Sequence, residues 1–224
     1  MPKEILCYGD SNTWGCIPRW KVVDDRPSQR YDTQTRWTSL LARELGSGYH
    51  IIEEGLGGRT SIYDRPGEAF LNGLPYFKPC LMTHRPLDLV VIMLGTNDIV
   101  QALQPTLDRL GDGIRTLIQV VQDTPKCGRD MVPPKILVVS PTHIKRGLGR
   151  TEVFDNYGGE TGRDLSLHFA PVYEEIAREK GCWFLDAALY AYPSDADGLH
   201  WTPEGHAAFA PPLAAKIREI FQDT

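Results

Sequence analysis

The chain has 224 residues, of which 42% are hydrophobic and 24% are charged, so its composition is that of a folded protein rather than a disordered one. The formal net charge of -5, from 29 acidic and 24 basic side chains with no long basic run, argues against nucleic acid or an anionic membrane as the main partner. The longest uninterrupted apolar run, 89–94, is far shorter than the roughly 20 residues that span a bilayer.

Cysteine usage and the N-terminus indicate the compartment. The apolar stretch before Gly9 is too short for the core of a secretory signal. The 5 cysteines form no C-x-x-C pair, so neither a disulfide framework nor a zinc knuckle is expected. We therefore expect a soluble, cytoplasmic protein with reduced thiols, and the length favours one domain over residues 1–224.

Short apolar runs alternate with helical patterns along the chain. Continuous apolar runs are typical of strands buried on both faces, and they occur at 4–8, 49–53, 87–94, 135–139 and 182–185. Helix-period segments cover 37–45, 107–121, 170–177 and 203–221. This alternation predicts right-handed parallel crossovers and hence an α/β fold: a three-layer α/β/α sandwich with a flavodoxin-like, five-stranded parallel sheet.

One long segment fits neither period. Residues 142–166 follow the fourth predicted strand and contain five glycines and many charged side chains. A long irregular loop inside a compact domain is often a lid or a binding loop, and sometimes it is disordered. The sequence leaves both alternatives open.

The first predicted strand ends at a serine, Ser11, preceded by Gly9 and Asp10. Doubly wound sheets place their chemistry in the loops beyond the C-terminal ends of the strands, so Ser11 is a candidate nucleophile. Asp10 or Ser11 can equally cap a helix, since both residue types are common caps. The residues near the other strand ends are therefore needed to distinguish a nucleophile from a helix cap.

Asp197 and His200 are candidate partners of that serine. At positions i and i+3 of a turn, the carboxylate can accept a hydrogen bond from Nδ1 of the imidazole, which leaves Nε2 free as a base. A solvated loop histidine is the alternative. Asp186 and Asp195 are rival carboxylates, and His206, within the last helical pattern, is a rival base.

Two further strand ends offer hydrogen-bond donors. Asn97 follows the most hydrophobic strand and Gly58 ends a glycine-rich turn, although a simple turn or cap is the alternative for each. If all these residues share one edge of the sheet, the set predicts acyl transfer. The oxyanion would then accept hydrogen bonds from the amides of Ser11 and Gly58 and from the side chain of Asn97.

These blocks resemble those of the SGNH (GDSL-type) hydrolases, in order and over nearly the whole chain. The matching blocks are Gly9-Asp10-Ser11, the glycine block at Gly58, Gly95-Thr96-Asn97-Asp98, and Asp197-x-x-His200. The chain is most similar to the bacterial arylesterase and acyltransferase branch, through 5–11, 53–56 and 92–98. One departure is Asn12, where the name-giving motif of the family has leucine, and this puts the polarity of the acyl pocket in doubt.

The resemblance implies a catalytic Ser11, His200 and Asp197, with Gly58 and Asn97 as oxyanion donors. It also implies that no cofactor or metal is needed and that the chain assembles into a symmetric homo-oligomer. Among residues close to the proposed site, we expect Asp10, Asn12, Trp14 and Trp201 to contact substrate. Further aromatic candidates for the wall of the pocket are Tyr63, Phe154 and Tyr157.

The first functional hypothesis is a serine esterase that hydrolyses small aryl, alkyl or acetyl carboxylic esters, with acyl transfer to alcohols as a second activity. A carbohydrate O-acetyl esterase is one alternative, and a non-catalytic ligand-binding module on the same fold is another. Metal-assisted hydrolysis through His143, His168, His200 or His206 is disfavoured, because no two of these histidines have the spacing of ligands on one helix face.

Overall fold

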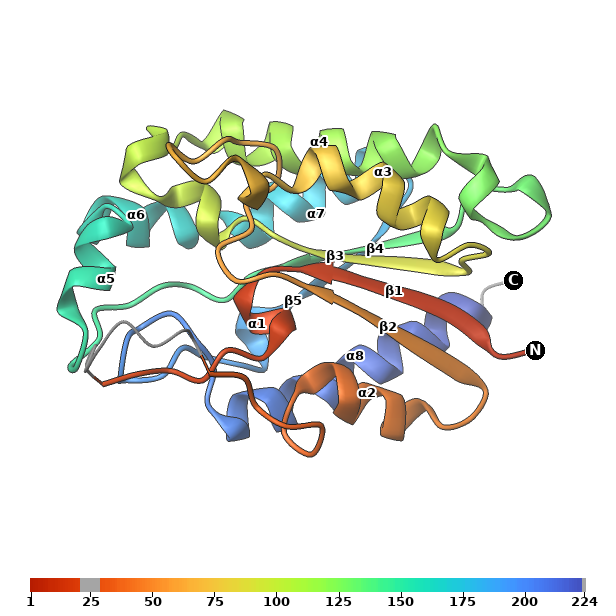
Figure 1. Cartoon of the computed structure of the whole chain (residues 1–224), viewed down its shortest axis with the longest axis horizontal. Helices are drawn as coiled ribbons and strands as arrows, with labels where there is room; N and C mark the ends of the chain where they lie inside the picture. Colours follow the sequence, from red (N-terminus) through yellow and green to blue (C-terminus); the bar gives the residue numbers. More distant parts are fainter. Residues whose placement is uncertain (21–28, 223–224) are drawn as a thin grey trace.

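The computed structural model describes residues 1–20 and 29–222. At its centre is a sheet of five parallel strands in the order β2-β1-β3-β4-β5 (Figure 1). The strands are β1 (Lys3–Gly9), β2 (Tyr49–Gly55), β3 (Leu89–Met93), β4 (Lys135–Ser140) and β5 (Trp183–Asp186). All five predicted strands are present, and their order is that of the flavodoxin-like sheet.

Helices cover both faces of this sheet, which confirms the predicted three layers. One face is covered by α2 (Trp37–Leu45) and α8 (Pro203–Gln222), and the other by α3 (Gly73–Thr83), α4 (Leu107–Gln122) and α7 (Phe169–Glu179) (Figure 1). Of these five covering helices, α3 is the one that the sequence did not predict, and it contains a proline, Pro79. No described helix has the length and apolar character needed to cross a membrane.

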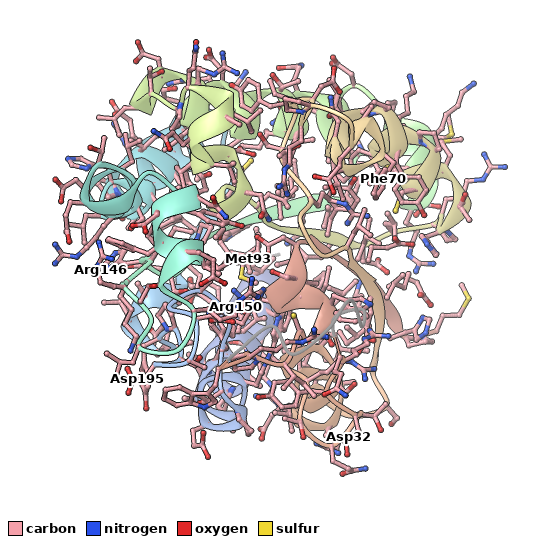
Figure 2. The ribbon with its side chains drawn as sticks, turned by 60° about the vertical axis from the view of Figure 1, so that its left-hand side comes forward. Asp32, Phe70, Met93, Arg146, Arg150 and Asp195 are labelled. Atoms are coloured by element: carbon pink, nitrogen blue, oxygen red, sulfur yellow. The ribbon has the colours of Figure 1, made fainter. Side chains whose placement is uncertain are left out.

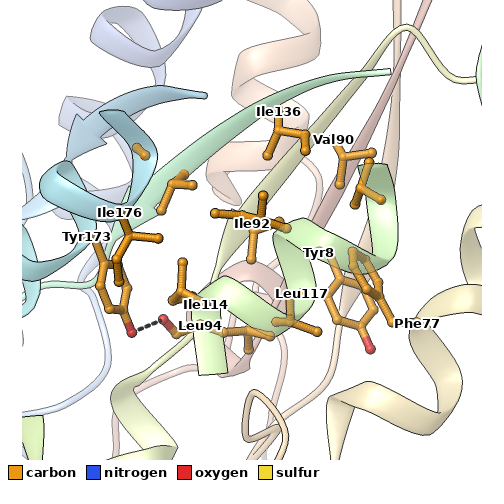
Figure 3. Close-up of a cluster of buried hydrophobic side chains, with 14 of the residues drawn as sticks. Tyr8, Phe77, Val90, Ile92, Leu94, Ile114, Leu117, Ile136, Tyr173 and Ile176 are labelled. Atoms are coloured by element: carbon orange, nitrogen blue, oxygen red, sulfur yellow. Dashed lines mark hydrogen bonds between the residues drawn. The ribbon is translucent and has the colours of Figure 1, made fainter. Parts of the chain in front are cut away.

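Burial on both faces explains the continuous apolar runs of β1, β3 and β4, whereas the edge strands β2 and β5 are mostly half-buried. In β1, Ile5 and Cys7 pack toward α2 and α8, whereas Leu6 and Tyr8 pack toward α3 and α4. Figure 3 shows the second of these clusters, in which α4 and α7 meet the sheet. There the hydroxyl of Tyr173 donates a hydrogen bond to the carbonyl of Leu94 at 3.0 Å.

The expectation of an irregular loop over 142–166 is wrong for its second part. The structure has α5 (Thr151–Asn156) and α6 (Gly159–Ser166) there. The buried positions of α6 are Gly162 and Ser166, one turn apart. Its single large apolar side chain, Leu165, packs against the core while partly exposed, so α6 has no series of large apolar residues at helical spacing that the sequence pattern could reveal.

Short helical turns complete the described chain at the ends of the strands and in the connections. The helix α1 (Ser11–Trp14) follows β1 directly. The 3-10 helices are Ala69–Leu71, Thr96–Ile99, Gln101–Leu103, Pro125–Cys127, Arg129–Met131 and Ala187–Leu189. The turns after β1, β2, β3 and β5 all begin at the C-terminal edge of the sheet, where the sequence placed its candidate residues.

Candidate active site

Ser11 is the first residue of α1, immediately beyond β1. The cap of this helix is Asp10, whose carboxylate accepts a hydrogen bond from the amide of Asn12 at 3.0 Å. Burial raises the pKa of Asp10 to about 6, against the opposing effect of that hydrogen bond. Because Asp10 serves as the cap, the hydroxyl of Ser11 is left for another role.

Asp197 and His200 form a hydrogen-bonded pair. Nδ1 of His200 lies 2.8 Å from Oδ2 of Asp197, and Oδ1 accepts from the amides of Leu199 and His200 at 3.0 Å each. The turn requires Gly198, whose φ is 71° and whose position leaves no space for a Cβ against the carbonyl of Lys145. A proton on Nδ1, held by the carboxylate, leaves Nε2 as the basic atom of the imidazole.

The pair alters the titration of both members. Burial favours the neutral carboxyl, but the hydrogen bonds from His200 and from the backbone outweigh it and lower the pKa of Asp197. Burial also favours the neutral imidazole, yet the bond to Asp197 and the neighbouring thiol of Cys16 raise the pKa of His200 above its ordinary value. The imidazole is therefore a stronger base than a free histidine.

The segment after β4 supports this turn from the side. Backbone hydrogen bonds join Leu148 to Asp195 at 2.7 Å and Arg150 to Ala196 at 2.8 Å. Figure 2 looks toward this edge of the sheet, with Arg146 and Arg150 on the same side as Asp195. This part of 142–166 thus holds the turn that carries Asp197.

The side chain of Asn12 connects the turn to the serine helix. Its Nδ2 donates to the carbonyl of Leu199 at 3.3 Å, and its Oδ1 accepts from the amide of Trp201 at 3.0 Å. These two contacts lie on either side of His200 in the chain. Asn12 directly follows Ser11, and its side chain therefore holds the histidine segment beside the helix that begins at the serine.

Gly58 and Asn97 lie on the two loops that face Ser11. Gly58 has a φ of 80°, a conformation that glycine adopts without strain. The next residue, Arg59, is buried and donates from Nη1 to the carbonyl of Gly9 at 2.9 Å and to that of Glu54. The carbonyl of Arg59 in turn accepts from Nδ2 of Asn97 at 3.0 Å, which ties the two loops together.

A cavity of about 460 Å³ lies between these elements. Its lining residues are Ser11, Trp14, Cys16, Leu56, Gly57, Gly58, Arg65, Asn97, Tyr157, Leu199 and His200. The structure thus brings together the serine, the histidine and both proposed oxyanion loops, with Asp197 buried behind His200.

Three of the four residues predicted to contact substrate lie away from the lining of this cavity. Trp14 lines it, whereas Asp10, Asn12 and Trp201 are buried in the surrounding structure. Nε1 of Trp201 donates to Oγ1 of Thr142 at 2.9 Å. The roles assigned to these residues as substrate contacts stay predictions.

Sequence reasoning did not single out Cys16 or Arg65, which line the cavity. Arg65 lies in the connection between β2 and α3, where no periodic pattern marks the direction of a side chain. Of the further aromatic candidates, Tyr157 lines the cavity, while Tyr63 and Phe154 are not among its lining residues.

The rival residues have other partners. His206 is fully buried, its Nδ1 accepts from the amide of Trp37 at 3.3 Å, and burial lowers its pKa to about 4. Asp186 accepts from the hydroxyl of Ser140 at 2.8 Å, and Asp195 pairs with Lys145 at 2.6 Å.

A group of possible metal ligands lies outside the cavity. Within the described chain, Glu54, Cys80 and His84 place one ligand atom each within 4.8 Å of one another. Nε2 of His84 is 2.8 Å from Oε1 of Glu54. None of the three is a lining residue of the cavity that contains Ser11.

Comparisons with known proteins are consistent with this geometry. The model of the GDSL-like lipase/acylhydrolase family matches residues 7–208. The chain is similar to the aryl esterase of M. smegmatis, with 36% identity, a TM-score of 0.88, and coverage of 97% of this chain and 99% of that one. It is also similar to a carbohydrate acetylesterase of Sinorhizobium meliloti, with 35% identity, a TM-score of 0.89, and coverage of 97% and 99%. A search of the curated proteins gave no match.

Proposed function

This chain belongs to the GDSL-like lipase/acylhydrolase family and is a carboxylic ester hydrolase of the serine type, and from this premise we propose that Ser11 is its nucleophile. The observation that carries the assignment is that Ser11 and His200 line one cavity while Asp197 holds His200 at 2.8 Å. Asp197, His200 and Ser11 then form the catalytic triad.

The proposed reaction has two stages. In the first, Nε2 of His200 takes the proton of Ser11 as Oγ attacks the ester carbonyl, and the leaving alcohol then receives that proton. In the second, His200 activates a water molecule that hydrolyses the acyl-serine. Asp197 keeps the imidazole oriented in both stages and stabilises the imidazolium.

The oxyanion of each tetrahedral intermediate accepts hydrogen bonds from the amides of Ser11 and Gly58 and from Nδ2 of Asn97. This assignment is supported by the presence of all three residues in the lining of the cavity. Loss of one such donor costs on the order of 3 kcal/mol in the activation barrier.

The proposed substrates are small esters with a short acyl group and an aryl or alkyl alcohol. A cavity of about 460 Å³, walled in part by Trp14, Leu56 and Leu199, is of suitable size and character. An acetylated carbohydrate is the second candidate, because a carbohydrate acetylesterase is as similar to this chain as the aryl esterase is. A panel of p-nitrophenyl esters and acetylated sugars distinguishes the two by their kcat/KM values.

The nucleophile is tested by labelling with a fluorophosphonate followed by peptide mass spectrometry. We expect the label on Ser11, and we expect labelling to be lost in His200→Ala. Ser11→Ala should abolish hydrolysis of p-nitrophenyl acetate while the thermal unfolding temperature stays close to that of the wild type. A Ser11→Ala protein with wild-type turnover would refute the assignment, and an inactive wild type would favour the ligand-binding alternative.

Several finer features are also part of the proposal. They are one domain over residues 1–224, a homo-oligomer, a cytoplasmic location, and acyl transfer to alcohols in competition with hydrolysis. Each has its own measurement: limited proteolysis, sedimentation, cell fractionation, and the ratio of ester to acid formed when an alcohol is added in water. A transfer ratio equal to that of an open-site esterase would reject the transferase activity.

A further inference from the structure

The side-chain amide of Asn97 has two possible orientations, and they differ in which group faces the cavity. In one orientation Nδ2 can donate to an oxyanion, and in the other Oδ1 would repel it. An oxyanion donor is effective only when its orientation is fixed before the reaction. The groups that determine this orientation are therefore part of the function proposed above.

Two neighbours fix the orientation of Asn97. The carbonyl of Arg59 lies 3.0 Å from Nδ2, and since a carbonyl can only accept, Nδ2 must face it. The hydroxyl of Tyr157 lies 2.6 Å from Oδ1 and donates to it. Among the described residues no acceptor is bonded to the second N–H of Nδ2, and Asn97 lines the same cavity as Ser11.

We propose that Tyr157 is a positioning residue of the oxyanion hole, because its hydroxyl holds the amide of Asn97 with an N–H toward the reacting carbonyl oxygen. This inference rests on the function proposed above. In this proposal Tyr157 takes no part in the proton transfer by His200 and donates no hydrogen bond to the oxyanion, because its hydroxyl is bonded to Oδ1 of Asn97. It acts through Asn97.

The environment of Tyr157 keeps its hydroxyl a donor. Burial raises the pKa of Tyr157 far above its ordinary value of 10, against a lowering effect of Arg65, so the phenol stays protonated over the whole working range of the enzyme. A protonated phenol that faces Oδ1 donates, and it cannot do so if the amide of Asn97 is rotated.

The hydroxyl of Tyr157 comes from the segment 142–166, which its sequence pattern predicted to be an irregular loop. Tyr157 lies between α5 and α6, and α6 packs against the 3-10 helix Thr96–Ile99 that carries Asn97. The segment 151–166 thus contributes Tyr157 to the lining of the cavity and, through it, sets the orientation of Asn97. Its helical structure has a functional reason.

The test is Tyr157→Phe, which keeps the ring and removes only the hydroxyl. We expect kcat for p-nitrophenyl acetate to fall roughly tenfold with little change in KM, less than the 10²–10³-fold loss typical of a missing oxyanion donor. The rate of inactivation by a fluorophosphonate should fall by a similar factor, because that reagent forms a tetrahedral adduct. The matched control is Tyr76→Phe. The hydroxyl of Tyr76 lies 3.3 Å from Oε1 of Glu54, and Tyr76 is not a lining residue of the cavity, so this substitution should leave kcat unchanged.

A double-mutant cycle separates positioning from a general structural effect. If Tyr157 acts through Asn97, then Tyr157→Phe should cost little further activity in an Asn97→Ala background. An equal loss in both backgrounds would overturn the proposal, as would a Tyr157→Phe protein with wild-type kcat. In the latter case an inactive Ser11→Ala protein would show that the hydrolase assignment survives.

A second measurement avoids any dependence on the folding of the variant. In a crystal structure of the wild-type phosphonate adduct, we expect Nδ2 of Asn97 within hydrogen-bond distance of the phosphonyl oxygen and the hydroxyl of Tyr157 still bonded to Oδ1. An adduct in which Tyr157 has left Asn97 would overturn the positioning role.

Discussion

Asn12 is hydrogen-bonded to the chain on both sides of His200. Its Nδ2 reaches the carbonyl of Leu199 at 3.3 Å and its Oδ1 receives the amide of Trp201 at 3.0 Å, across 187 and 189 positions of sequence. Leucine, the residue of the family motif at this position, has neither a donor nor an acceptor. From the sequence alone, the departure at Asn12 concerns the polarity of the acyl pocket. In the structure, the Asn12 side chain instead connects the N-terminal and C-terminal parts of the chain.

The first prediction is that Asn12→Leu weakens both folding and catalysis. The substitution leaves a buried carbonyl and a buried N–H without partners, so the free energy of unfolding should fall by about 1–3 kcal/mol. Since the histidine segment loses its attachment beside Ser11, kcat should fall as well, and urea denaturation with steady-state kinetics measures both effects.

A matched variant separates the two effects of Asn12→Leu. Gln122→Leu removes an amide that donates to the carbonyl of Lys180 at 3.0 Å, far from the cavity. It should lower stability without changing kcat. If Asn12→Leu keeps both the stability and the kcat of the wild type, the attachment has no role.

The second prediction concerns the pH dependence of turnover. Burial lowers the pKa of His200, but Asp197 and Cys16 outweigh it, and the net pKa is raised above 6.5. Because only the neutral imidazole can accept the proton of Ser11, activity should rise with pH and reach half its maximum above pH 6.5. A profile of kcat/KM for p-nitrophenyl acetate with its midpoint at pH 6 or below would contradict the raised pKa.

The third prediction isolates the contribution of Cys16 to that profile. The thiol is one of the groups that raise the pKa of His200. Cys16→Ala should therefore move the midpoint of the pH profile to lower pH, whereas Cys182→Ala, outside the cavity, should leave it in place. Equal midpoints in all three proteins would show that the thiol does not act on the imidazole.

The sequence was sufficient for the sheet and for the edge at which the chemistry lies. Strands buried on both faces must be apolar at every position, so β1 and β3 were recognisable, and parallel strands must place the turns that follow them at one edge. The placement of Ser11 and Asn97 in one cavity follows from that rule. Asp197 and His200 were recognisable because their contact is local.

The parts that the sequence did not reveal depend on contacts between distant, non-periodic residues. The buried positions of α6 are Gly162 and Ser166, and a single large apolar side chain, Leu165, packs against the core. The hydrogen bond between Tyr157 and Asn97 joins residues 60 positions apart. Nothing in the local sequence around Tyr157 distinguishes a hydroxyl that orients an amide from a ring that fills space.

The fourth prediction concerns Glu53, which joins β2 to α2. Its carboxylate accepts hydrogen bonds from Thr38 at 2.5 Å, Ser39 at 3.0 Å and Arg36 at 2.9 Å. Burial alone raises the pKa of Glu53, but these hydrogen bonds outweigh it and lower the net value below 4.5. We expect Glu53→Gln to lower the free energy of unfolding at pH 7 by about 1–3 kcal/mol.

The effect of Glu53→Gln should depend on pH in one direction. A carboxyl with a lowered pKa in the folded state stabilises the fold above its unfolded pKa, and this stabilisation is lost as the pH falls through the folded value. The difference between wild type and variant, measured by urea denaturation, should therefore shrink below pH 4.5. Glu219→Gln, which breaks an exposed pair with Lys216, should cost less than about 1 kcal/mol at pH 7. A Glu53→Gln effect that is the same at pH 7 and pH 3.5 would show that the ionised carboxylate is not the stabilising form.

The last prediction concerns Arg65, which lines the cavity and whose side chain is 27% exposed. Its nearest carboxylate, Glu68, lies 3.4 Å away, in a pair exposed enough to be weak. An ester with a free carboxylate on its acyl chain, such as a monoaryl succinate, can place that charge near Arg65. We expect Arg65→Gln to lower kcat/KM for the succinate ester about tenfold relative to the aryl acetate, which corresponds to about 1.4 kcal/mol. Added salt should reduce the same ratio in the wild type, because it screens the attraction.

The control variant is Arg109→Gln. The guanidinium of Arg109 lies 4.2 Å from the ring of Tyr63, and Arg109 does not line the cavity, so this substitution should change neither rate. An unchanged succinate-to-acetate ratio in Arg65→Gln would mean that the acyl chain does not reach this side of the cavity.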